Sequence, residues 1–224
     1  MSDYIITLDG PGGSGKTTLA KMLAERLNIT YLDTGAMYRG VGYYAKKVGV
    51  KHGDEEGVKN ILHTIDVSIK RENGEQHVYI NAEDVTPYIR TPEISMWACF
   101  VAQIKEVRIM LVEIQRALAR GCSCVLDGRD IGSYVLPNAD FKFYVSASID
   151  ERAKRRYNEL IQKGQDNISF ESVKEDMIAR DEQDSKRDFV PLCVPDGAYV
   201  IDTTNLSIND VLEIILSKVG RFQN

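Results

Sequence analysis

A glycine-rich stretch near the start of the chain has the residue types and spacing that hold a phosphate chain. In Leu8–Ala20, LDGPGGSGKTTLA, the pattern Gly-x-x-x-x-Gly-Lys-Thr runs from Gly10 to Thr17. A β-rich run precedes it and leucines at helical spacing follow it, which is the context that this pattern requires. Glycines let backbone N–H groups surround phosphates, and the helix N-terminus adds a partial positive charge. A chance glycine turn before an amphipathic helix is the alternative, but the complete match favours a P-loop.

The P-loop predicts how a nucleoside triphosphate is bound. We expect Lys16 to reach the β- and γ-phosphates and Thr17 to bind Mg²⁺. Asp127 ends a predicted strand and is a candidate to orient a magnesium-bound water, although carboxylates at such positions often only cap a loop. ATP and Mg²⁺ are therefore the predicted cofactors. The predicted ATP-binding residues are Gly10, Pro11, Gly12, Gly13, Ser14, Gly15, Lys16, Thr17 and Thr18.

A second segment, LDTGAMYR, ends at Arg39 and places a hydroxyl, a phenol and a guanidinium close together. An alcohol acceptor would need a general base, for which Asp9 and Asp33 are candidates. A phosphate monoester is already largely anionic near pH 7, since its second pKa is about 6, and it needs cations instead. Arginines cluster at the motif boundaries and favour the phosphate, although a solvated helix face explains Arg155 or Arg156 alone equally well. These arginines are Arg39, Arg108, Arg129, Arg152, Arg155, Arg156, Arg180 and Arg187.

Length and composition narrow the class of protein. A chain of 224 residues suffices for one sizeable core with a small inserted lobe. A formal net charge of −5 argues against nucleic acid as a partner. We find no apolar run of membrane-spanning length and no signal peptide, so we expect a cytoplasmic protein without a membrane partner. Four cysteines without paired zinc spacing predict reduced thiols in packed positions: Cys99, Cys122, Cys124 and Cys193.

Hydrophobic periodicity predicts an α/β protein. Strand, glycine loop and helix come first, and near-continuous apolar runs at 122–127, 141–147 and 198–201 read as buried parallel strands. Between them, 66–70 and 77–81 alternate around Asn73-Gly74 and predict an antiparallel hairpin. Helices are expected over 36–48, from Pro92, over 105–119 and from near Ser207. Ser148 and Glu151 predict a capping box at the start of an arginine-rich helix.

The motifs together resemble bacterial-type cytidylate kinase over nearly the whole chain. They are DGPGGSGKTT, YLDTGAMYR, TPEIS, VR with a downstream QR, DGRDIG, and RDEQDSKR followed by PL. The resemblance implies transfer of the γ-phosphoryl group of ATP to CMP or dCMP with Mg²⁺. It also implies a P-loop kinase core with a five-stranded parallel sheet of order 2-3-1-4-5, an inserted acceptor-binding lobe with a small antiparallel sheet, and a helical lid. The core would comprise 1–33 and 105–224, with the lid at about 151–168; the acceptor lobe would be 34–104, with a hairpin insertion at about 64–90.

Matched residue by residue, the resemblance implies specific contacts. Thr34 and Arg39 would hold the acceptor phosphate, and Tyr38 would pack against the pyrimidine. Arg108 and Asp130 would read the cytosine edge, whereas Asp130 could instead anchor Arg129 or cap the next turn. The other residues implied in CMP binding are Cys99, Arg129, Arg180, Asp184 and Arg187. Those implied in catalysis are Lys16, Arg129, Arg152, Arg156 and Arg187.

One departure from the family pattern and several alternative functions remain to be considered. Cys99 stands where the family commonly has a base-contacting serine; sulfur is a weaker donor, so Ser95, one helical turn away, could take part instead. A UMP or AMP kinase is the nearest alternative, but adenylate kinases lack the hairpin insertion and DGRDIG. A kinase for a small metabolite or a nonenzymatic nucleotide sensor fits the arginine set less well. We expect a monomer acting on small nucleotides.

Overall fold

The computed structural model describes residues 3–72, 74–165 and 167–220. The chain forms two compact units. Unit 1 comprises residues 1–31 and 121–224, and unit 2 comprises residues 32–120, so the boundary falls within strand β2.

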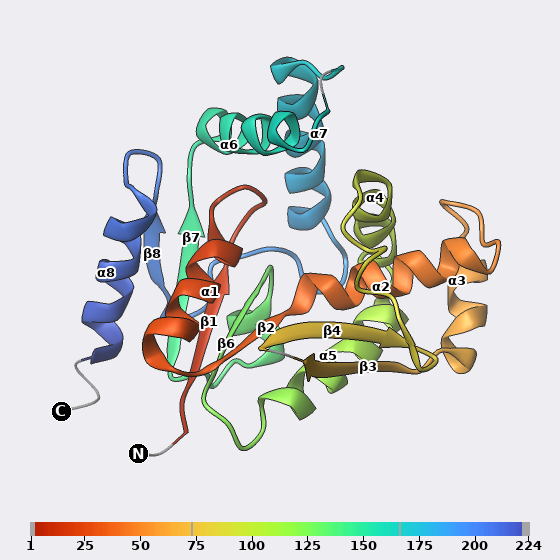
Figure 1. The fold of residues 1–224 in the computed structure, drawn as a ribbon, viewed down its shortest axis with the longest axis horizontal. Helices are drawn as coiled ribbons and strands as arrows, with labels where there is room; N and C mark the ends of the chain where they lie inside the picture. Colours follow the sequence, from red (N-terminus) through yellow and green to blue (C-terminus); the bar gives the residue numbers. More distant parts are fainter. Residues whose placement is uncertain (1–2, 73, 166, 221–224) are drawn as a thin grey trace. The chain divides into compact units, whose positions relative to one another are not determined.

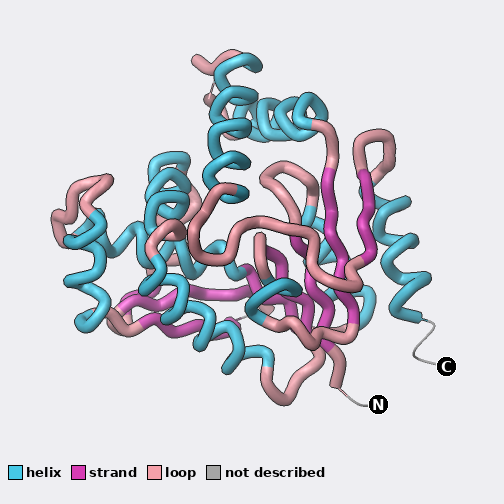
Figure 2. The backbone as a smooth tube through the Cα atoms, turned by 180° about the vertical axis from the view of Figure 1, so that it is seen from behind, coloured by secondary structure: helices cyan, strands magenta, loops and turns pink. Residues whose placement is uncertain are grey.

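Unit 1 is built on a five-stranded sheet in the order β2-β6-β1-β7-β8 (Figures 1 and 2). Strand β1 pairs in parallel with β6 and β7, and β7 pairs in parallel with β8. Numbered among themselves in chain order, these strands have the order 2-3-1-4-5, which confirms the predicted P-loop kinase topology. The strands are β1 (Ile5–Asp9), β2 (Thr30–Asp33), β6 (Cys124–Gly128), β7 (Phe141–Ser146) and β8 (Tyr199–Asp202).

Helices α1 and α8 of unit 1 pack their apolar stripes against this sheet. Leu19 and Leu23 of α1 are fully buried with Phe143 of β7 and Ile215 of α8. Burying each such side chain contributes about 1.5–3 kcal/mol, so the sheet and its helices form one core. The helical elements are α1 (Lys16–Leu27), the π-helical turn η2 (Ile131–Val135), α6 (Ile149–Gln162), α7 (Phe170–Ser185) and α8 (Ile208–Val219). Helices α6 and α7 pack on each other through a small cluster of their own.

The capping box predicted at Ser148 is only half formed. The Ser148 hydroxyl accepts a hydrogen bond from the Glu151 N–H at 3.3 Å. The Ser148 N–H, however, donates to the Thr204 hydroxyl at 2.9 Å, and the Glu151 carboxylate accepts from Arg155 Nε. A nearby hydroxyl and an arginine one turn along the helix therefore replace the reciprocal bond. A complete capping box forms at α8, between Ser207 and Asp210.

Unit 2 contains a helical layer and a small antiparallel sheet. Its sheet has the order β3-β4-β5, and the β3–β4 hairpin is in register from Val67 opposite Ile80 to Glu72 opposite Glu75. This confirms the predicted hairpin; of its predicted turn, Asn73 lies outside the described residues. The strands are β3 (Val67–Glu72), β4 (Glu75–Ile80) and β5 (Glu83–Asp84). The helices are α2 (Thr34–Lys47), α3 (Glu55–Ile61), the 3₁₀ turn η1 (Leu62–Thr64), α4 (Pro92–Val101) and α5 (Lys105–Ala119).

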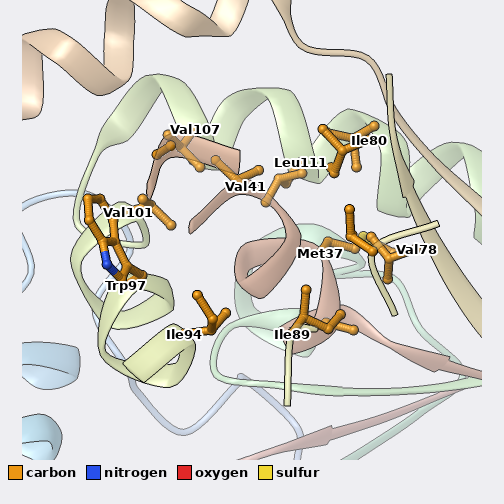
Figure 3. Close-up of a cluster of buried hydrophobic side chains, with 14 of the residues drawn as sticks. Met37, Val41, Val78, Ile80, Ile89, Ile94, Trp97, Val101, Val107 and Leu111 are labelled. Atoms are coloured by element: carbon orange, nitrogen blue, oxygen red, sulfur yellow. The ribbon is translucent and has the colours of Figure 1, made fainter. Parts of the chain in front are cut away.

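Helix α2 lies at the centre of the unit 2 core (Figure 3). Its Met37 and Val41 are fully buried in the same cluster as Val78 of β4. Two glycines allow the close approach of neighbouring elements: a Cβ at Gly40 would lie 2.9 Å from Val78 Cγ1, and one at Gly42 would lie 2.8 Å from Trp97 Cβ. The glycines of DTGAMYRGVG therefore let the acceptor-motif helix pack tightly onto β4 and α4.

The cysteines are free, as predicted, but not all are packed. Cys124 is buried, and burial raises the pKa of its thiol to about 12, which makes it unreactive. Cys122 is half-buried and precedes β6 rather than lying in it. The packed position predicted for Cys193 is wrong: it is exposed in the loop after α7, where the backbone polar groups require water. Within the described residues, we find no helix long and apolar enough to cross a bilayer.

Candidate active site

The glycine loop connects β1 to α1 in unit 1, as predicted. Gly10, Gly13 and Gly15 all have positive φ angles, of 141°, 74° and 92°. At Gly10 a Cβ would also lie 2.1 Å from the carbonyl oxygen of Val145, so a side chain cannot be accommodated. Turns with such left-handed residues commonly form concave groups of N–H donors that bind anions such as phosphates.

Lys16 is buried at the first turn of α1. Its ammonium donates to the carbonyl oxygen of Pro11 at 2.6 Å and to the Ser14 hydroxyl at 3.1 Å. Burial, followed by repulsion from Arg129, lowers the pKa of Lys16 well below its ordinary value. An anion bound among these cations would favour the charged form. Lys16 is thus held against the loop by the Pro11 carbonyl oxygen and the Ser14 hydroxyl.

Thr17 and Asp127 lie together, as predicted. The Thr17 hydroxyl donates to Asp127 Oδ2 at 2.7 Å, and the Tyr31 hydroxyl donates to Asp127 Oδ1 at 2.8 Å. Mg²⁺ prefers oxygen ligands and commonly takes one or two from the protein and the rest from phosphates and water. The Thr17 hydroxyl and the Asp127 carboxylate are oxygen donors of this kind. Among the described residues we find no cluster of three or more His, Cys, Asp or Glu that could hold a metal.

Three of the predicted substrate arginines surround Asp184. Arg129 Nε lies 3.0 Å from Asp184 Oδ2, and Arg187 Nη2 lies 3.3 Å from Asp184 Oδ1. Burial opposes ionisation of Asp184, but Arg129, Arg187 and Arg180 outweigh it and lower its pKa. Arg180 Nε is buried without a hydrogen-bond partner among the described residues. One carboxylate therefore gathers an excess of positive charge that suits an anionic ligand.

The two predicted lid arginines are placed differently. Arg152 is buried and donates to the P-loop carbonyl of Gly12 at 3.2 Å and to the carbonyl of Ala147 at 2.9 Å. It also pairs with Asp181 of α7 at 2.6 Å. Arg156 instead pairs with Glu159 on its own helix, at 2.8 Å. Of the two arginines, Arg152 contacts the P-loop.

Asp9 is a residue whose role sequence reasoning missed. Its two carboxylate oxygens accept hydrogen bonds from the N–H groups of Ile131 and Gly132, each at 2.7 Å. Burial raises the pKa of Asp9 from 3.8 to about 6, although these two bonds oppose the shift. The carboxylate thus holds the start of η2 directly after the predicted ligands Arg129 and Asp130. The sequence left open that the Asp130 side chain caps this turn. Asp130 is buried but its side chain makes no capping hydrogen bond there, and the Asp9 carboxylate binds the N–H groups of the turn instead.

In unit 2, Asp33 organises the predicted acceptor motif. As N-cap of α2 its Oδ1 accepts from the Ala36 N–H at 2.9 Å, while Oδ2 lies 2.8 Å from Arg39 Nη2 and 3.4 Å from Arg90 Nη2. Arg39 Nε is buried without a hydrogen-bond partner among the residues that the structure describes, so it retains a donor for an anion. Thr34, the first residue of α2, is buried beside this group.

The predicted base-reading residues of unit 2 are partly brought together. The Arg108 guanidinium lies 5.8 Å from the centroid of the Tyr38 ring, within the range of a cation–π contact. Cys99 is half-buried on α4, and its carbonyl oxygen accepts from the Gln103 side chain at 3.3 Å. The Ser95 hydroxyl donates to the Thr91 carbonyl of its own helix at 2.9 Å.

Four residues have supporting roles that the sequence did not predict: Asp9, which the sequence suggested only as a possible general base, Tyr31, Gln76 and Asp181. The sequence does carry a signal for Gln76, because it occupies a position of β4 where strict alternation calls for an apolar residue. Asp9 ends β1 before the glycine loop and Asp33 ends β2 directly before α2, but a sequence does not show which atoms their carboxylates bind.

Comparison with known proteins agrees with this geometry. A family model for cytidylate kinase matches residues 6–221. The chain is 47% identical over 220 residues to a protein of Clostridioides difficile named cytidylate kinase, covering 98% of this chain and 100% of that protein. It is 46% identical to a protein of the same name from Halalkalibacterium halodurans, covering 98% of each. A crystal structure of an uncharacterized protein from Eubacterium ventriosum matches with a TM-score of 0.56 at 14% identity, over 98% of this chain and 99% of that one, and shares the fold. The chain belongs to the cytidylate kinase family.

Proposed function

We propose that this protein transfers the γ-phosphoryl group of ATP to CMP or dCMP, producing ADP and the cytidine diphosphate. The proposal rests on one observation: this chain of the family contains both a complete P-loop and a cluster of arginines around Asp184. A P-loop alone indicates a triphosphate donor, whereas the cluster indicates a second anionic substrate. Phosphoryl transfer between two polyanions depends mainly on positioning and on charge neutralisation, and these residues supply both.

On the donor side, residues of unit 1 bind and orient the triphosphate. The loop N–H groups and Lys16 hold the β- and γ-phosphates. Mg²⁺, bound by Thr17 and through water by Asp127, would neutralise charge on the phosphate oxygens. Arg152 reaches the loop directly, and Arg156 belongs to the proposed lid at about 151–168, which would exclude water from the reaction.

On the acceptor side, arginines hold the monophosphate. Arg39 with Thr34 in unit 2, and Arg129 with Arg187 in unit 1, bind the phosphate oxygens and stabilise the charge that develops during transfer. Arg180 and Asp184 contact the ribose. Because the attacking oxygen of a monophosphate is already anionic, no general base is required.

Recognition of the base relies on a carboxylate and an arginine. Cytosine presents an exocyclic amino group where uracil presents a carbonyl oxygen. Asp130 accepts a hydrogen bond from that amino group, and Arg108 donates to the acceptors of the ring. Tyr38 packs against the pyrimidine, and Cys99 makes a weaker contact than a serine would.

The lobes have separate tasks in this proposal. Residues 1–33 and 105–224 form the kinase core, and 34–104 form the acceptor-binding lobe, with the hairpin insertion at about 64–90. The protein acts as a monomer on free nucleotides in the cytoplasm, without a nucleic-acid or membrane partner. Light scattering at assay concentrations tests the monomer.

A coupled assay of ADP formation tests the reaction. ATP is supplied with CMP, dCMP, UMP or AMP in parallel, with and without Mg²⁺. The proposal expects turnover of CMP and dCMP far above that of UMP and AMP, and loss of activity when Mg²⁺ is chelated. Equal turnover of all four, or preference for AMP or UMP, contradicts the cytidylate assignment.

A further inference from the structure

An amide lies on the apolar face of the inserted hairpin. In β4, Gln76, Val78 and Ile80 alternate onto one face, and Val78 and Ile80 pack against α2 at Gly40. Figure 3 shows Val78 and Ile80 in this cluster with Met37 and Val41 of α2. Gln76 is the polar member of this face, at the end of the strand where α2 begins. A polar group in such a position requires a hydrogen-bonding partner.

That partner is the backbone of Asp33, 43 residues away in the chain. Gln76 Oε1 accepts from the Asp33 N–H at 2.9 Å, and Gln76 Nε2 donates to the Asp33 carbonyl oxygen at 2.9 Å. The amide therefore binds both polar groups of one residue. Both bonds are part-buried, so losing them leaves backbone groups poorly solvated.

Asp33 begins the acceptor motif and contacts its arginine Arg39. It is the last residue of β2 and the N-cap of α2, and its carboxylate pairs with Arg39 and Arg90. Fixing its backbone fixes the direction of its carboxylate, and the carboxylate in turn fixes the Arg39 guanidinium. A shift of about 1 Å in such a group is enough to weaken binding substantially.

We propose that Gln76 is a positioning residue, through which the inserted hairpin holds the acceptor-phosphate segment 33–39 in its binding geometry. The inference rests on the proposed function for the role of Arg39, but the hydrogen bonds themselves do not depend on it. The hairpin then acts on the acceptor site through one side chain, in addition to packing against α2.

The kinetic test is Gln76→Met, which preserves length and volume and removes both hydrogen bonds. Losing both hydrogen bonds should raise the KM for CMP roughly tenfold, with the KM for ATP changed less than about twofold. Glu75→Met on the same strand is the matched control, because Glu75 is exposed, and it should leave both constants unchanged. A wild-type KM for CMP in Gln76→Met overturns the proposal.

Val78→Ala separates positioning from stability. It removes apolar packing from the same face of β4 and should lower the melting temperature while changing the KM for CMP less than about twofold. If Val78→Ala raises the KM for CMP as much as Gln76→Met does, the effect is general destabilisation of the hairpin and the proposal fails.

Hydrogen exchange supplies a measurement that needs no activity. In Gln76→Met the Asp33 amide should exchange at least about tenfold faster, whereas the Val78 and Ile80 amides of the hairpin keep their protection. Unchanged exchange at Asp33 overturns the proposal. If the wild-type protein does not phosphorylate CMP, the proposed function fails while this measurement still decides whether Gln76 holds Asp33.

Discussion

The P-loop of unit 1 and the acceptor segment of unit 2 each begin where a strand ends in an aspartate, but they are held in different ways. The loop takes its shape from glycines with positive φ angles and from the first turn of α1. The segment 33–39 takes its geometry from side chains, namely the Asp33 carboxylate, its two arginines, and Gln76 from a distant strand. The first is a backbone site and the second a side-chain site.

This difference determines what each site tolerates. A backbone site depends on positions that only glycine fits, such as Gly10. A side-chain site depends on partners that can be replaced one at a time, each with a graded cost. We therefore expect substitutions at the donor site to abolish activity, and substitutions around Asp33 to weaken acceptor binding in steps.

The largest effect is expected for Lys16→Ala. This change removes the buried ammonium that is proposed to bind the β- and γ-phosphates, and it should lower kcat about a hundredfold or more with every acceptor. Steady-state kinetics measure it, with circular dichroism as the folding control and Lys21→Ala, an exposed lysine on the same helix, as the matched variant. Comparable turnover in a folded Lys16→Ala protein would remove Lys16 from the donor site.

The next effect tests base reading. Asp130→Ala leaves the cytosine amino group without its acceptor and should lower kcat/KM for CMP roughly ten- to a few-hundred-fold. UMP should lose much less, so the ratio of CMP to UMP activity should fall toward unity. If both substrates lose equally, Asp130 only supports its loop, and the assignment is wrong.

Features that depend on residues close together in the sequence were largely predictable. The P-loop, the hairpin and the parallel strand order all follow from spacing, periodicity and the resemblance, and the structure confirms them. Contacts between residues far apart in sequence were not predictable from pattern. Gln76 and Asp33 are 43 residues apart, and Asp9 binds N–H groups 122 and 123 residues away. The predicted capping box at Ser148 failed for the same reason, because Thr204 from a distant segment took the N–H.

A third prediction concerns the pH dependence that Asp9 confers on stability. Burial raises the pKa of Asp9 to about 6 in the fold, so the unfolded chain releases this proton at lower pH than the folded one. The protonated carboxyl therefore favours folding below about pH 4, and this contribution is lost as pH rises through about 6, by on the order of 2–3 kcal/mol.

Asp9→Asn should remove that dependence while losing one acceptor for the η2 N–H groups at every pH. The difference in unfolding free energy, wild type minus variant, should fall between about pH 4 and 6.5 in denaturant titrations. Asp196→Asn, at an exposed carboxylate, is the control. A difference that stays constant over this range would show that Asp9 ionises normally in the fold.

The smallest effect is expected at Arg90, and it tests the side-chain site at its most exposed member. Arg90 and Arg39 share Asp33 Oδ2, and the side chain of Arg90 is 55% exposed. Without Arg90, the full negative charge of Asp33 acts on Arg39 and competes with an acceptor phosphate for that guanidinium. Exposed ion pairs contribute only about 0.2–1 kcal/mol, so Arg90→Ala should raise the KM for CMP by no more than about fivefold and leave kcat unchanged.

Arg71→Ala is the matched control. Arg71 is an exposed arginine of β3 whose guanidinium donates to the carbonyl oxygen of Gly74 at 3.0 Å, and its removal should have no effect on the KM for CMP. Because salt screens exposed charges, the effect of Arg90→Ala should shrink further when ionic strength is raised. A loss at Arg90 as large as that at Arg39 would mean that Arg90 binds the phosphate directly. The acceptor site would then rest on two equivalent arginines that share Asp33, and the graded tolerance expected of a side-chain site would not hold there.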